Sequence, residues 1–111
     1  MNDKDRVLLE KIIKYAQNVF LFTNGMDYES FIRDDKTLSA TAFSIGQIGE
    51  YAKSLSDELQ FSNPHIDWKG MRGVRNRIVH DYDNVELEVI WDITTIDLPD
   101  MVSKLRNILN E

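Results

Sequence analysis

The sequence contains no cysteine among its 111 residues. This absence excludes disulfide bonds, zinc sites built on thiolates and a cysteine nucleophile. Long apolar runs are missing as well, and none approaches the roughly 20 residues that a membrane-spanning helix needs. The first six residues lack the basic start and the apolar centre of a signal peptide. From these absences we expect a cytoplasmic protein that does not contact a membrane.

Histidine is scarce, since the chain has only His65 and His80, fifteen positions apart. No set of aspartates or glutamates accompanies either histidine at the spacing of a zinc or calcium site. The chain also lacks a glycine-rich phosphate loop. We therefore expect neither a bound metal nor an organic cofactor. His65 follows Pro64 in a predicted loop, residues 61–65, where we expect it to be solvated.

Acidic residues outnumber basic ones by 19 to 13, which gives a formal charge of -6. This balance argues against a protein that coats nucleic acid non-specifically, and we expect no DNA partner. The hydrophobic fraction of 42% and the charged fraction of 29% are ordinary for a globular protein. Because a chain of this length has room for one core, we expect residues 1–111 to form a single domain.

Apolar residues recur at steps of three and four along most of the chain, as they do in amphipathic helices. The predicted helices cover residues 4–24, 28–33, 37–58, 67–81 and 85–109. Asp3, Asp27 and Asp67 are the expected N-caps. Pro99, close after Asp97, either starts a separate helix or kinks a continuous one. With no alternating strand pattern of useful length, the sequence predicts an all-α fold, an antiparallel bundle of four to five helices.

The predicted helix 37–58 has small residues that would let another helix approach closely: Ala42, Gly46, Gly49 and Ala52. Glu50 lies in the middle of this helix, next to its apolar stripe. Two interpretations of Glu50 remain open at this point. It is either a carboxylate on the helix surface or the partner of a buried arginine.

A cationic cluster stands out on this acidic chain: Lys69, Arg72, Arg75 and Arg77. These four cations fall within nine residues, and no acidic residue lies between Asp67 and Asp81. Such a local excess of positive charge is typical of a phosphate-binding site. An internal hub of ion pairs would have the same composition, so the pattern alone leaves both interpretations open.

On a helical wheel Arg72, Asn76 and His80 fall in one row, on successive turns. Arg75 lies instead among apolar neighbours, where its charge must be paired or must bind an anion. Arg75 and His80 are about 140° apart on an ideal helix, so they do not face one small substrate unaided. Either the helix ends or bends near His80, or a second copy of the chain brings its own row alongside.

Two glycines bear on this choice, because Gly70 and Gly73 lie in the same predicted helix. Each costs roughly 1 kcal/mol relative to alanine in a helix interior. A close approach of backbones, such as a dimer contact, would justify that cost. The alternative is that the two glycines only loosen the start of the helix.

The chemistry of an Arg and a His suits attack on a phosphodiester without a metal. Histidine moves a proton near neutral pH, and arginine stabilises negative charge on phosphoryl oxygens. RNA supplies its own nucleophile, the 2′-hydroxyl, so RNA cleavage is the most economical reaction for so few groups. A purely structural role for Arg75 and His80 stays open on this chemistry alone.

The segment from Arg75 to Tyr82 resembles the Arg-x4-His-x-Tyr motif of HEPN domains, in particular the HepT-like toxins of HepT/MNT toxin–antitoxin pairs. The segment from Ile48 to Lys53 is similar to the family's Ile-Gly-Glu-Ala-Ala-Lys, with Tyr51 as a departure. Further similarities are Trp68, Met71-Arg72 and the region from Val89 to Pro99, while Gly73-Val74 departs from the pattern. The resemblance covers the chain from about Leu38 onward.

This resemblance implies an all-α HEPN fold and a homodimer with the motif at the subunit interface. It implies metal-independent ribonuclease activity, with Arg75 and His80 as the active pair. We expect Asn76 to assist and Arg72 to contact RNA. The resemblance further implies a partner antitoxin, a minimal nucleotidyltransferase, that silences the toxin by adding AMP to Tyr82. The alternative is a non-catalytic helical module that binds a nucleotidyltransferase or a nucleotide.

Overall fold

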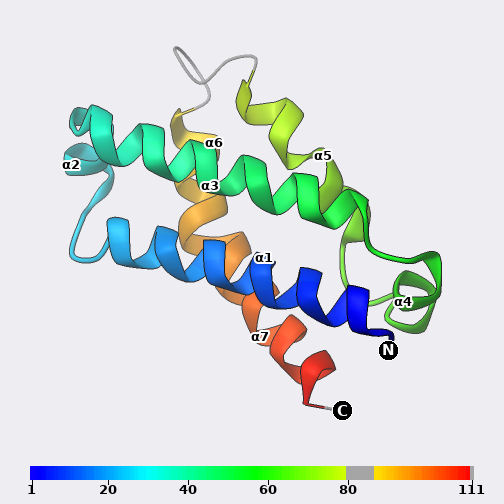
Figure 1. The fold of residues 1–111 in the computed structure, drawn as a ribbon. Helices are drawn as coiled ribbons and strands as arrows, with labels where there is room; N and C mark the ends of the chain where they lie inside the picture. Colours follow the sequence, from blue (N-terminus) through cyan, green and yellow to red (C-terminus); the bar gives the residue numbers. More distant parts are fainter. Residues whose placement is uncertain (80–86, 111) are drawn as a thin grey trace.

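The structure, a computed structural model, describes the backbone of residues 1–79 and 87–110 and the side chains of residues 1–74 and 87–110 (Figure 1). The elements are α1 (Asp3–Phe22), α2 (Tyr28–Arg33), α3 (Asp35–Lys53), α4 (Asp57–Ser62), α5 (Trp68–Val79), α6 (Leu87–Asp92), the π-helical segment η1 (Ile93–Asp97) and α7 (Leu98–Leu109). No strand occurs in these ranges. The prediction of an all-α helical bundle is confirmed.

The first helix begins one residue earlier than predicted, because Asn2 rather than Asp3 is its N-cap. The side-chain oxygen of Asn2 accepts a hydrogen bond from the backbone N–H of Asp5, at 2.7 Å. Asp3 lies in the first turn, where a carboxylate interacts favourably with the helix dipole. The helix ends at Phe22, two residues before the predicted end, and a turn over residues 23–25 follows, in which Gly25 has the positive φ of 78° that favours glycine.

The second and third helices both start with an aspartate cap. Asp27 and Ser30 form a reciprocal capping box, in which the Ser30 N–H donates to the Asp27 carboxylate at 2.8 Å. The predicted cap at Asp27 is therefore confirmed. Asp34 accepts from the Thr37 N–H at 3.1 Å and starts α3 directly after α2 ends. These local bonds explain how two helices follow each other without a linker.

The predicted helix 37–58 is wrong at its end, because α3 stops at Lys53 and α4 starts at Asp57. Ser56 caps α4, since its hydroxyl oxygen accepts from the Leu59 N–H at 3.2 Å. The N–H and hydroxyl of Ser56 also donate to the buried carboxylate of Asp5 in α1, at 3.0 and 2.5 Å. These two hydrogen bonds tie the segment between α3 and α4 to α1. Residues 61–62, predicted as loop, belong to α4.

The core lies where α3 packs against both α1 and α5, with α7 against α1 (Figure 1). Its fully buried side chains are mostly aliphatic and include Leu9, Ile12, Val19, Ile45, Ile48, Ile90 and Leu105. Phe31 of α2 is also fully buried, and its ring centroid is 4.9 Å from that of Trp91 in α6. The aromatic contact fixes the short helix α2 over the start of the C-terminal helices.

The C-terminal region is one continuous helical path from α6 through η1 to α7, rather than two separated helices. Asp97 has helical backbone angles and its side chain makes no capping hydrogen bond. Pro99 has no N–H, which removes one intrahelical hydrogen bond and crowds the preceding turn. The wider π turn of η1 lies just before it and accommodates the change. In the described ranges no helix is long and apolar enough to cross a membrane.

Candidate functional site

The first five residues of the predicted motif, 75–79, lie on α5, which packs along α3 (Figure 1). Asp67 caps this helix as predicted, because its Oδ1 atom accepts from the Gly70 N–H at 2.9 Å. The helix continues through Val79, so Arg72 and Asn76 lie one turn apart on one row, as predicted. The predicted end of the helix near Asp81 lies outside the described residues.

The structure describes only part of the proposed catalytic set. The backbone of Arg75 and Asn76 is helical, but their side chains lie outside the described residues. His80 and Tyr82 lie outside them entirely. The roles of Arg75, Asn76, His80 and Tyr82 therefore stay predictions.

The structure describes the side chains of two cations of the cluster, Lys69 and Arg72. Arg72 lies three residues before Arg75 on α5. Its Nη1 atom donates a short hydrogen bond to Oε1 of Gln60 in α4. Gln60 in turn donates from Nε2 to the carbonyl oxygens of Leu55 and Ser56, at 3.2 and 3.4 Å. The guanidinium has five N–H donors, and a neutral glutamine does not cancel its charge. This bond orients Arg72 from α4 while the cation keeps its capacity to bind an anion.

Glu50 lies partly exposed on α3, with 40% of its side chain accessible to solvent. Its carboxylate is 3.2 Å from Nζ of Lys53, one turn further along the same helix. This position agrees with the interpretation of Glu50 as a carboxylate on the helix surface. A role of Glu50 toward Arg75 stays a prediction, because the Arg75 side chain lies outside the described residues.

The two glycines of α5 differ in their surroundings. A Cβ atom on Gly70 would overlap the carboxylate of Asp67, the residue that caps the helix. The absence of a side chain at Gly70 is therefore explained within one chain. A Cβ atom on Gly73 would meet no described atom within 4 Å. Contact with a second chain would therefore explain the glycine at position 73 but is not needed to explain the one at position 70.

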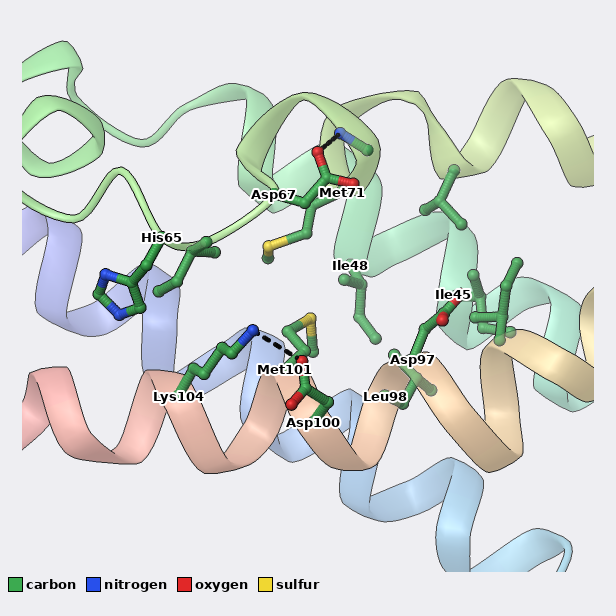
Figure 2. A pocket seen from close by; sticks show the side chains of 14 residues that line it. Ile45, Ile48, His65, Asp67, Met71, Asp97, Leu98, Asp100, Met101 and Lys104 are labelled. Atoms are coloured by element: carbon green, nitrogen blue, oxygen red, sulfur yellow. Dashed lines mark hydrogen bonds and ion pairs between the residues drawn. The ribbon is translucent and has the colours of Figure 1, made fainter.

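A cavity of about 220 Å³ between α3, α5 and the η1–α7 region was not predicted from the sequence (Figure 2). His65 is exposed in its loop, as predicted, and lines one end of this cavity. Asp97, Met101 and Lys104 line the cavity from η1 and α7. These residues carry no linear motif, because the cavity is assembled by three segments that are distant in sequence.

No group of three or more histidine, aspartate or glutamate side chains is placed to hold a metal ion within the part of the chain that the structure describes. His80 and Asp81 fall outside that part. The expectation of a site without a metal therefore stays a prediction.

Comparison with known proteins adds evidence from the whole chain. The family model "Ribonuclease HepT-like" matches residues 12–108. "Putative RNase MJ0127" of Methanocaldococcus jannaschii is 32% identical over 100% of this chain and 93% of its own length. "Probable ribonuclease HepT" of Thermococcus cleftensis is 28% identical over 90% of this chain and 91% of its own length. No solved structure shows a significant match.

The family match reaches further than the resemblance from Leu38 onward that the motifs predicted. It begins at residue 12 and so includes more than half of α1. It also spans the Arg75–Tyr82 motif and continues almost to the end of α7. Because the match covers most of the chain and a relative is 32% identical over all of it, this protein belongs to the HepT-like family of HEPN ribonucleases.

Proposed function

We propose that this protein is the toxin of a toxin–antitoxin pair, a metal-independent endoribonuclease that uses Arg75 and His80. The observation that carries this proposal is the ribonuclease family match over residues 12–108, which includes the complete Arg-x4-His-x-Tyr motif. The relatives named as ribonucleases match over nearly their whole length, so the proposal concerns a domain of the same extent.

In the proposed reaction the 2′-hydroxyl of the RNA attacks the adjacent phosphorus atom. The bond from phosphorus to the 5′-oxygen breaks, which leaves a 2′,3′-cyclic phosphate on one product and a 5′-hydroxyl on the other. His80 moves a proton, either from the attacking hydroxyl or to the departing 5′-oxygen. Arg75 positions the phosphate and stabilises the charge that grows on its oxygens.

The surroundings of the motif support an RNA phosphate as the ligand. Lys69 is exposed near the start of α5, and Arg72 is held on the same helix by Gln60. Asn76 lies one turn beyond Arg72 and is proposed to assist by hydrogen bonding. Together these residues form a local cationic surface on a chain of net charge -6.

Two further features belong to the proposal. The protein acts as a homodimer in which the motifs of two chains meet, because Arg75 and His80 diverge by about 140° on one helix. A partner nucleotidyltransferase silences it by joining AMP from ATP to the phenol oxygen of Tyr82, with release of pyrophosphate. The attached phosphate then occupies the place of an RNA phosphate beside Arg75 and Arg72.

The decisive experiment is incubation of the purified, unmodified protein with a broad RNA panel in EDTA. Cleavage should persist and leave cyclic phosphate ends, while a substrate with 2′-deoxyribose at the cut site should resist. His80→Ala should lower the rate by about 10²–10⁴, the usual contribution of a positioned acid–base group. Arg75→Lys should also lose activity, because it keeps the charge but loses the planar two-pronged contact.

A matched control is His65→Ala, which removes the other histidine from an exposed loop. Its cleavage rate should equal that of the unaltered protein. Full activity in folded His80→Ala, or cutting of the 2′-deoxy substrate, would assign the activity to another site or a contaminant. Absence of cleavage over the whole RNA panel would favour the alternative, a helical module that binds a nucleotidyltransferase or a nucleotide.

The silencing step has its own test. Incubation with the partner nucleotidyltransferase and ATP should add the mass of one or more adenylates and abolish RNA cleavage. Tyr82→Phe should gain no mass and should stay active, since it lacks only the phenol oxygen. Equal labelling of Tyr82→Phe would place the modification on a different side chain.

A further inference from the structure

The cavity between α5 and α7 is an open groove with an apolar interior. Ile45 and Ile48 of α3 form its floor, and Val74 of α5 lies beside them. Figure 2 shows the side chains of Met71 and Met101 extending into the space between α5 and α7. Methionine side chains are flexible and polarizable, so paired methionines adapt to apolar partners of different shape.

The π-helical segment η1 shapes one wall of this groove. Ile93 and Asp97, its first and last residues, both line the cavity. Within η1 the buried Thr94 hydroxyl donates to the Ile90 carbonyl oxygen at 2.9 Å. A π turn re-aims the side chains that follow it, and such turns are frequent at functional sites. The π turn therefore forms part of the groove wall.

The mouth of the groove is acidic. Asp67, Asp97 and Asp100 line it together with the cation Lys104 and the imidazole of His65. Figure 2 shows the Asp67 carboxylate turned toward the first turn of α5, where it accepts from the Gly70 N–H. Lys104 is already paired with Asp100, at 2.9 Å. Asp97 is exposed, and its carboxylate makes no capping hydrogen bond at the start of α7. The mouth therefore has negative charge that the groove itself does not neutralise.

This groove is separate from the proposed RNA site. Val74 lies about 160° from Arg72 around α5, so the groove and the Arg72–Asn76 row occupy opposite sides of the helix. Carboxylates at the mouth would repel the phosphates of RNA. The groove therefore belongs to a different ligand.

We propose that the groove docks a segment of a partner protein that carries apolar side chains about one helical turn apart, flanked by lysine or arginine. The groove is lined along α7 and η1 from Ile93 to Lys104, a length of roughly 16 Å at the rise of an α-helix. That length matches two to three turns of a helix laid in a groove, with the apolar face inward. A flanking cation pairs with Asp97. This docking is independent of the proposed ribonuclease activity.

The four methionines allow a direct test with the full-length protein. Met71 and Met101 line the groove, whereas Met1 and Met26 do not. The protein is labelled with ¹³C at the methionine methyl groups and titrated with a synthetic amphipathic helix of leucine and lysine. The methyl resonances of Met71 and Met101 should shift saturably, while those of Met1 and Met26 stay in place. A peptide with every lysine replaced by glutamate should cause no shift.

Charge reversal at the mouth gives the matched variants. Asp97→Lys should weaken binding of the lysine peptide about 1.5-fold to fivefold, the range for exposed charge pairs. Asp92→Lys makes the same change at an exposed position in α6 that does not line the groove, and should bind as the unaltered protein does.

Several outcomes would overturn the proposal. They are no shift at millimolar peptide, equal binding of the glutamate peptide, and equal weakening by Asp92→Lys and Asp97→Lys. Shifts of Met71 and Met101 that follow protein concentration without peptide would show that a second copy of this chain occupies the groove instead.

Discussion

At the scale of single residues, Asp5 shows how one buried carboxylate fixes the chain path. It is 2% exposed and accepts two hydrogen bonds from Ser56, which lies 51 residues further along the chain. Ser56 is also the N-cap of α4. Asp5 therefore connects the first turn of α1 to the break between α3 and α4.

Replacement of Asp5 by alanine should lower the free energy of unfolding by about 3–6 kcal/mol. The variant leaves two Ser56 donors without their acceptor, and bonds to a charged acceptor are worth about 1.5–3 kcal/mol each. Urea denaturation followed by circular dichroism measures the change. Asp3→Ala is the control, because Asp3 is exposed in the same first turn. If both variants lost the same stability, the bonds to Ser56 would not be the cause.

Gln60 and Arg72 show a second connection at this scale. The side-chain amide of Gln60 donates to the carbonyl oxygens of Leu55 and Ser56, just before α4, and its oxygen accepts a hydrogen bond from Arg72 of α5. A chain of hydrogen bonds thus runs from Arg72 through Gln60 and Ser56 to Asp5.

At the scale of elements, the aspartate caps of α2 and α3 make the stability of these helices depend on pH. Hydrogen bonds from the backbone N–H groups of Ser30 and Thr37 lower the pKa of Asp27 and Asp34 respectively, below the ordinary 3.8. A carboxyl group with a lowered pKa in the folded state stabilises that state when it is ionised. This contribution is present above pH 3.8 and is lost as the pH falls through the lowered value.

Asp34→Asn should therefore make stability less sensitive to acid over that range. Asparagine is also a good N-cap, so the helix start is retained while the titrating group is removed. Thermal unfolding at a series of pH values between neutrality and strong acid measures the slope. Identical slopes for Asp34→Asn and the unaltered protein would contradict the assignment.

The sequence predicted two of the three helix caps that it assigned to local bonds, while Asn2 rather than the predicted Asp3 caps α1. The caps at Asp27 and Asp67 form within three residues, and both are present. The break after Lys53 was missed because its cause, Asp5, is distant in sequence. The π turn before Pro99 was missed because periodicity alone does not separate a kink from a wider helical turn.

The candidate functional residues likewise include some that the sequence predicted and some that it did not. The Arg75–Tyr82 motif is a linear pattern, so it was found from the sequence, and the family match spans it. The acidic groove combines residues of α3, α5 and α7 with no common spacing, so only their packing reveals it. Gly70 was considered as a dimer contact, whereas the adjacent Asp67 carboxylate accounts for it within one chain.

At the scale of the whole molecule, the remaining prediction is a homodimer whose interface includes the Gly70–Gly73 side of α5. Gly73→Ala distinguishes an effect on dimer association from an effect on the folding of one chain, since a Cβ atom there meets no described atom within 4 Å. Alanine should stabilise the isolated helix by about 0.5–1 kcal/mol. The same methyl group should obstruct a second chain that approaches the backbone closely. Stability and association are therefore expected to change in opposite directions.

Analytical ultracentrifugation at micromolar concentration should show a dimer for the unaltered protein and a weaker dimer for Gly73→Ala. Ser103→Ala, at an exposed position of α7, is the control and should leave association unchanged. If both chains complete the site, the cleavage rate per chain should fall on dilution through the dissociation constant, and Gly73→Ala should lose activity at higher concentrations. A monomer that cleaves RNA at a rate independent of dilution would show that one chain brings Arg75 and His80 together by itself.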